Sequence, residues 1–271
     1  MSKKLYEETD IQAIATAIRA KNNQTTKYKV SQMANAITNI QEAPDSYIEE
    51  VYNDEGFLTS ASLVGYTKIR RYMFALATYL TTVNFSDGLT AIEGYAFENC
   101  SALKLSTFPS GLTSIGESAF VGCGAIDAVK LPTGLTKIGV NAFYNCTKLA
   151  LITLPAGITL LQNSVFKGCT SLALTALPAN LTSVGSETFE GCTNLVIKEI
   201  PANLKLIGSY AFKNCTGITE LTFKNTPTSI DVTAFEGCTN LKTINVPWAE
   251  NAVADAPWGA TGATINYGYT G

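Results

Sequence analysis

Apolar and polar positions follow one pattern that repeats seven times between Gly88 and Pro247. Each repeat carries a phenylalanine 23 residues after the previous one and a cysteine three residues after each phenylalanine. Because no insertion or deletion breaks this interval, we expect each repeat to form one coil of a solenoid whose like residues stack into a continuous core. The expected core ladder consists of Phe97, Phe120, Phe143, Phe166, Phe189, Phe212 and Phe235 together with Cys100, Cys123, Cys146, Cys169, Cys192, Cys215 and Cys238.

Two kinds of local structure are predicted within each repeat. Residues 142–146 place an alanine, a phenylalanine and a cysteine at helical spacing, so that one short helical turn would point all three inward. Residues 151–154 alternate in the manner of a short strand with one buried face, and Pro155 ends it because proline cannot extend the hydrogen-bond ladder. The expected fold is therefore an α/β repeat solenoid with 23-residue turns, a parallel sheet on one face and short helical turns opposite.

Three repeats place an aliphatic residue one position early in the strand. The segments are 103–109, 172–178 and 195–201, and the early residues are Leu105, Leu174 and Ile197. Since the repeat length remains 23, we expect a local bulge in the strand and no change of the coil.

The repeat resembles the BspA-type repeat of bacterial leucine-rich repeat proteins, whose consensus has the form LxxIxLPxxLTxIGxxAFxxC. Residues 149–169 match it, and the resemblance extends over about residues 62–247. The chain departs from the pattern at Gln162 and Asp231, which replace a glycine, and at Pro227, which replaces a leucine. The resemblance implies a protein or glycan partner bound on the concave side of the sheet.

Outward positions of the predicted strands form the candidate binding face. They are Thr82, Asn84, Thr107, Lys130, Thr153, Glu199, Glu220, Thr222, Thr243 and Asn245. The alternative is a sheet that is merely solvated, because threonine is a good strand residue on its own account.

The N-terminal segment has a different pattern. Residues 10–21 and 30–40 each carry an apolar stripe at helical spacing, which predicts a helical hairpin over residues 1–41. The stretch DIxxIAxAIRxKN at 10–22, with Tyr28 and the MAxAI-like residues 33–37, resembles the N-terminal module of tail and minor structural proteins of phages and prophages of Gram-positive bacteria. That resemblance implies assembly with other virion proteins through these helices.

The remaining boundaries complete the expected organisation. Residues 42–87 form a linker and a degenerate first coil, 88–247 the regular solenoid, and 248–271 a C-terminal cap and tail. In the cap, Trp248 and Trp258 are expected to form a hydrophobic lid, with a sugar-stacking platform as the alternative.

The amino-acid composition limits the kinds of catalytic and metal sites that the chain can form. The chain lacks histidine, which removes Ser-His, Cys-His and His-metal sites, and it has neither a phosphate-binding GxxxxGK loop nor recurrent paired carboxylates. The cysteines occupy small core positions without CxxC pairs, so we expect buried free thiols, with oxidation between adjacent coils as the alternative. We therefore expect no cofactor, no metal and no enzymatic activity.

Charge and hydropathy bear on partners and location. A net charge of −3 with 15% charged residues gives no indication of a nucleic-acid partner. The sequence has no apolar leader and no run long enough to cross a membrane. We expect a non-enzymatic recognition or structural protein of a phage or prophage tail, found in the virion or in the bacterial cytoplasm before lysis. The rival expectation is a bacterial cell-surface adhesin whose leader has been removed.

Overall fold

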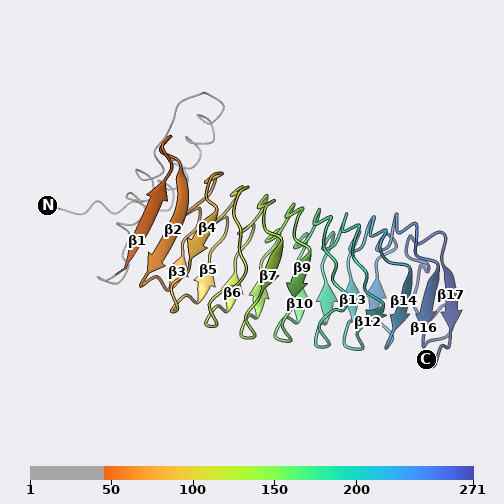
Figure 1. Cartoon of the computed structure of the whole chain (residues 1–271). Helices are drawn as coiled ribbons and strands as arrows, with labels where there is room; N and C mark the ends of the chain where they lie inside the picture. Colours follow the sequence, from red (N-terminus) through yellow and green to blue (C-terminus); the bar gives the residue numbers. More distant parts are fainter. Residues whose placement is uncertain (1–45) are drawn as a thin grey trace.

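The computed structural model describes residues 46–271, and these form a stack of coils along one axis from β1 to β17 (Figure 1). The expected helical hairpin and its proposed virion contacts fall at residues 1–41, outside the described residues. The strands are β1 (Tyr47–Tyr52), β2 (Leu58–Val64), β3 (Lys68–Ile69), β4 (Thr82–Asn84), β5 (Ala91–Ile92), β6 (Ser114–Ile115), β7 (Ala128–Lys130), β8 (Lys137–Ile138), β9 (Leu151–Thr153), β10 (Leu160–Leu161), β11 (Ser183–Val184), β12 (Glu199–Ile200), β13 (Leu206–Ile207), β14 (Glu220–Phe223), β15 (Ser229–Ile230), β16 (Thr243–Val246) and β17 (Thr264–Tyr267).

The predicted parallel sheet is present but is divided into three parts. We call this side of the solenoid the long-strand face. Its sheets have the strand orders β1-β2-β4, β7-β9 and β12-β14-β16-β17, and all pairs except β1–β2 are parallel. Neighbouring strands are in the 23-residue register, as shown by the pairing of Val129 with Ile152. The gaps between the sheets coincide with segments 103–109 and 172–178.

An extra residue between buried positions explains those gaps. Leu174 and Leu177 are both buried, and the two residues between them are exposed. In β9 and the residue after it, a single exposed residue separates buried Ile152 from buried Leu154. The bulged segment 172–178 forms no strand, and segment 103–109 retains only one bridge, between Thr107 and Lys130. In these two segments the early aliphatic residue thus has the predicted local effect and also interrupts the sheet, whereas segment 195–201 has the same spacing of buried residues and still forms β12.

A second row of strands was not predicted. We call it the short-strand face; it consists of two sheets with the orders β3-β5-β6-β8 and β10-β11-β13-β15, built from two-residue strands. Four glycines that follow strands of this row, among them Gly139, lie so close to the preceding coil that an added Cβ would meet backbone atoms at 2.5–2.8 Å. Gln162 replaces this glycine after β10, and the break between the two sheets falls between β8 and β10. Gln162 thus lies at the coil where strand pairing within the short-strand face is interrupted.

The predicted helical turns are wrong, because residues 46–271 contain no helix. Around Phe143, the backbone N–H groups bond alternately to a carbonyl oxygen of the next coil and to one three residues back in the same coil. Phe143 N donates to Val165 O of the next coil at 2.9 Å, whereas Cys146 N donates to the carbonyl of Phe143, three residues back, at 3.1 Å. Asn141 and Asn145 have φ of 57°, which a right-handed helix does not accommodate. Hydrogen bonding between coils therefore replaces the i→i−4 bonds of a helix.

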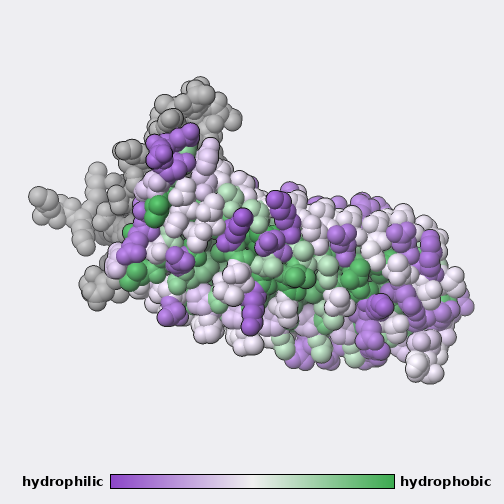
Figure 2. All heavy atoms as spheres, in the orientation of Figure 1, coloured by the Kyte–Doolittle hydropathy of each residue, from purple (hydrophilic) through white to green (hydrophobic). Residues whose placement is uncertain are grey.

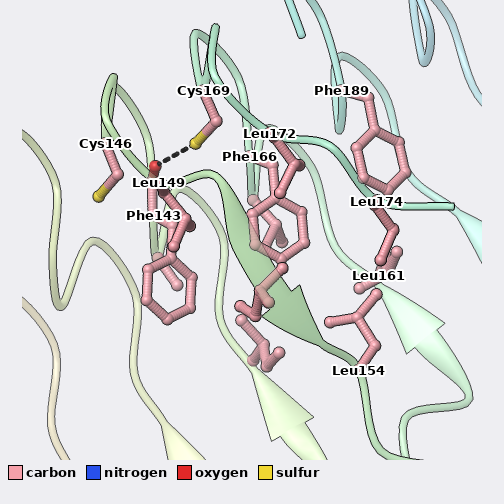
Figure 3. Packing of buried hydrophobic residues seen from close by; sticks show 14 of the residues in the cluster. Phe143, Cys146, Leu149, Leu154, Leu161, Phe166, Cys169, Leu172, Leu174 and Phe189 are labelled. Atoms are coloured by element: carbon pink, nitrogen blue, oxygen red, sulfur yellow. Dashed lines mark hydrogen bonds between the residues drawn. The ribbon is translucent and has the colours of Figure 1, made fainter. Parts of the chain in front are cut away.

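The core ladder is confirmed. All seven predicted phenylalanines are fully buried, and the column begins one coil earlier, at Phe74. Successive rings are stacked at centroid distances of 5.2–5.7 Å with interplanar angles of 4–14°. Each pair is worth about 0.5–1.5 kcal/mol beyond the burial of its area. Figure 3 shows the rings of Phe143, Phe166 and Phe189 following one another from coil to coil.

The C-terminal end is closed by the predicted lid. Trp258 is fully buried and its Nε1 donates to Ala254 O at 2.7 Å, and Trp248 is also buried, so the alternative of an exposed sugar platform is wrong. β17 pairs with β16 as the last strand of the long-strand face. The lid therefore caps the apolar column where no further coil would cover it.

Candidate functional site

The predicted binding residues lie on the long-strand face, but in two columns that flank a buried one. The pairing of Lys130 with Thr153 continues the first column, and the pairing of Glu220 with Thr243 belongs to the second. The first column contains Asn84, Thr107, Lys130, Thr153, Glu199, Thr222 and Asn245, and the second contains Thr82, Glu220 and Thr243. The structure thus spreads these residues along the whole face and gathers only some of them.

At the C-terminal end of the face the polar residues bond to one another. Asn245 Nδ2 donates to Glu220 Oε1 at 2.8 Å and to Thr222 Oγ1 at 3.1 Å, and its Oδ1 accepts from Asn266 Nδ2 at 2.8 Å. Asn245 is 3% exposed, so the expectation that its side chain is open to a partner on this face is wrong. The reason is that β17 adds one more strand, whose Asn266 covers the amide.

Two further predicted positions also have partners within the chain. Asn84 Nδ2 donates to Ser62 Oγ at 3.0 Å, and Glu199 forms an ion pair with Lys224 at 2.9 Å. Both groups are exposed, and an exposed ion pair contributes little to stability. These contacts fit a solvated sheet surface as well as a binding surface.

The middle of the face has a different character. A hollow of about 800 Å³ opens there over β7 and β9, and it is bordered by Ser106 of one bulged segment and by residues 173–178 of the other. Figure 2 shows apolar side chains gathered over the middle of this side of the molecule, with polar residues around them. Leu151 is 64% exposed, the largest exposed fraction among the large exposed hydrophobic residues in the part of the chain that the structure describes. We call this feature the central hollow.

The chemistry of the central hollow is simple. Its lining contains no aromatic ring, and Lys130 is the only charged residue among the lining residues. The other polar side chains are hydroxyls, including that of Thr153, which pairs with Lys130 in the sheet register. The arrangement offers apolar contact with one cation at its side.

Sequence reasoning found Lys130 and Thr153 but missed Leu151. The signal was present, because Leu151 occupies an outward strand position, where the other repeats without a bulge place Ala128, Glu220 and Thr243. The repeat pattern did not predict that two bulged segments would flank β7 and β9.

The cysteines are buried and free, as predicted. Each thiol donates to the carbonyl oxygen of the phenylalanine 26 residues earlier, as Cys169 Sγ does to Phe143 O at 3.1 Å (Figure 3). Burial raises the pKa of Cys123, Cys169 and Cys238 to about 12, which keeps these thiols protonated at neutral pH. Within residues 46–271 no cluster of three or more His, Cys, Asp or Glu residues could hold a metal ion.

Ion pairs near the phenylalanine turns lie outside the central hollow. Lys167 Nζ contacts Glu187 Oε2 at 2.6 Å and Glu190 Oε2 at 2.9 Å. The hydrogen bond to Glu187 raises the pKa of Lys167 to about 12, and the same bond lowers the pKa of Glu187.

Across the described range, no helix is long and apolar enough to cross a membrane.

Comparison with known proteins identifies the repeat. Residues 67–196 and 161–255 match the model of the BspA type leucine rich repeat region in six copies. Among curated proteins none matches the chain. A crystal structure of a T. pallidum leucine-rich repeat protein is similar, with 25% identity, a TM-score of 0.48, and coverage of 76% of this chain and 85% of that one.

Two further solved structures are similar. A leucine-rich repeat protein from Bacteroides ovatus has 19% identity and a TM-score of 0.44, with 84% of this chain and 76% of that chain covered. A leucine rich cell surface protein from Faecalibacterium prausnitzii has 18% identity and a TM-score of 0.35, with 84% and 96% covered. The family match spans well over half of the residues, from the first coil to the C-terminal lid. The chain belongs to the BspA-type leucine-rich repeat family.

Proposed function

We propose that this protein is a non-enzymatic recognition protein that binds a protein or a cell-surface glycan through its long-strand face. The observation that carries the proposal is the exposure of Leu151 in the central hollow, because a contiguous apolar area on an otherwise polar surface is typical of an interaction site. The membership of the chain in a leucine-rich repeat family supports a binding or adhesion role.

The setting of this recognition is a separate part of the proposal. A bacterial cell-surface adhesin fits the family to which the repeats belong. A phage or prophage tail protein that contacts the host cell fits only the sequence resemblance of residues 10–37, which lie outside both the family match and the described residues. Because the family match covers the coils that carry the long-strand face, we favour the cell-surface setting.

Binding of the full chain to a glycan array and to whole bacterial and host cells tests the proposal. Lys130→Glu on the long-strand face and Lys137→Glu on the short-strand face are matched variants, because both lysines are exposed and both changes alter the net charge equally. We expect Lys130→Glu to reduce binding at least tenfold and Lys137→Glu to leave it unchanged. Absence of binding to all cells and glycans would refute the proposed function, and equal effects of the two variants would remove the long-strand face from it.

A further inference from the structure

The central hollow has a shape that a small molecule would not fill. Sites for small ligands bury most of the ligand surface. Here Leu151, which lines the hollow, remains 64% exposed, so the hollow is open to solvent at this residue. An occupant must therefore bring the surface that closes it, which favours a macromolecule.

The residues that line the hollow also favour a protein partner over a glycan. A sugar ring is usually held by stacking on an aromatic ring, and none is present among the residues that line the hollow. Among the apolar residues of the lining, Leu151 and Ala176 are exposed and Ala128 is half-buried, and they lie among exposed hydroxyl groups. Such a surface gains most from contact with another apolar side chain.

Lys130, the single charged residue of the lining, sets a second requirement for the partner. Lys130 and Leu151 are diagonal neighbours on β7 and β9, since Lys130 pairs with Thr153 and Ala128 pairs with Leu151. Diagonal neighbours in a sheet are separated by about 7–8 Å. Two residues of an extended chain advance by about 6.6–6.8 Å. An acidic residue two positions from an apolar one would therefore reach Lys130 while the apolar side chain contacts Leu151.

We propose that the central hollow binds an extended segment of a protein partner, with an aliphatic or aromatic side chain seated on Leu151 and an acidic residue nearby paired with Lys130. This inference rests on the proposed recognition function and narrows its partner to a protein. The bulged segments at 103–109 and 172–178 form the two sides between which the segment lies. The sequence changes that interrupt the sheet are in this view what create the binding site.

Selection of displayed random dodecapeptides on the full chain tests this inference. We expect the enriched peptides to carry an apolar side chain with Asp or Glu one to three positions away. Leu151→Thr is expected to weaken the selected peptides at least tenfold, which corresponds to about 1.4 kcal/mol. Leu206→Thr is the matched control, because Leu206 is 48% exposed on the short-strand face, and it should leave binding unchanged. Lys130→Glu should shift the enrichment from acidic to basic residues.

Several results would overturn the inference. They are a lack of enriched peptides, enriched peptides without an apolar residue, or equal binding by the wild type and Leu151→Thr. If whole cells or glycans bind and Lys130→Glu abolishes this binding while Leu151→Thr does not affect it, the protein segment is excluded although recognition by the face stands. Loss of all binding to cells, glycans and peptides would instead refute the proposed function itself.

Discussion

Gly168 and Gly191 offer a matched test of how the coils contact one another. They occupy the same column of the solenoid with φ of 75° and 76°. A Cβ on Gly168 would lie 2.1 Å from Oδ1 of Asn145 in the preceding coil, whereas a Cβ on Gly191 would have its nearest contact at 3.8 Å, to Gly168 Cα. The two substitutions to alanine therefore share the backbone cost and differ in the clash.

The magnitudes can be estimated separately. Alanine in the left-handed region costs about 1–2 kcal/mol at either site. At Gly168 the amide of Asn145 must also leave its rotamer, which adds about 0.5–1.5 kcal/mol. We therefore expect Gly168→Ala to lower the free energy of unfolding by about 0.5–1.5 kcal/mol more than Gly191→Ala does.

Urea unfolding followed by circular dichroism measures this difference, provided that the slope m stays the same among variants. Asn145→Gly removes the obstructing amide while tolerating the φ of 57° at that position. In the double-mutant cycle, Asn145→Gly should recover the extra cost of Gly168→Ala and should leave the cost of Gly191→Ala unchanged. Equal costs of the two alanines, or a coupling energy near zero, would refute the proposed contact between Asn145 and Gly168.

Three further predictions concern the core, the polar ladder and the thiols. Phe143→Ala should lower the free energy of unfolding by about 3–5 kcal/mol, because it leaves a cavity between two stacked rings; a loss below about 1 kcal/mol in urea unfolding would contradict the column. Asn245→Ala should cost about 1–3 kcal/mol by removing the hydrogen bonds that its buried amide makes with Glu220, Thr222 and Asn266, whereas exposed Thr153→Ala should change stability by less than about 0.5 kcal/mol in the same assay. The thiol pKa of Cys123 is raised from 9.0 to about 12 in the folded state, so the folded protein retains this proton above pH 9 while the unfolded chain loses it. The contribution of this thiol to stability should therefore be constant below pH 9 and decline as the pH rises toward 12; replacing Cys123 by Ala should make the alkaline decline shallower, and an unchanged pH profile would contradict burial of the thiol.

The solenoid could be predicted from the sequence because its period is strict. A 23-residue interval without exception requires like residues to stack, and the burial of Phe143 and Cys146 follows from it. The conformation between them could not be predicted in the same way. Residues at helical spacing also point inward when alternate N–H groups bond to the next coil, and spacing alone does not distinguish the two.

The candidate site shows where a local pattern is insufficient. Lys130 and Thr153 were predicted as outward residues, and the structure places them beside the central hollow. Asn245 followed the same pattern but is covered by a strand that starts at residue 264, beyond the repeats. The hollow itself depends on the combined effect of two bulged segments on the strands between them, which is a property of neighbouring coils and not of one repeat.

The positions of the seven cysteine sulfur atoms test the central claim most directly. Anomalous diffraction from sulfur in crystals of the full chain would locate them without reference to the chain trace. The stacked coils predict one row of seven unbonded sulfurs, with neighbours separated by roughly 5 Å, the distance between adjacent strands. Scattered cysteine sulfurs, or pairs at about 2.05 Å as in disulfides, would contradict the account.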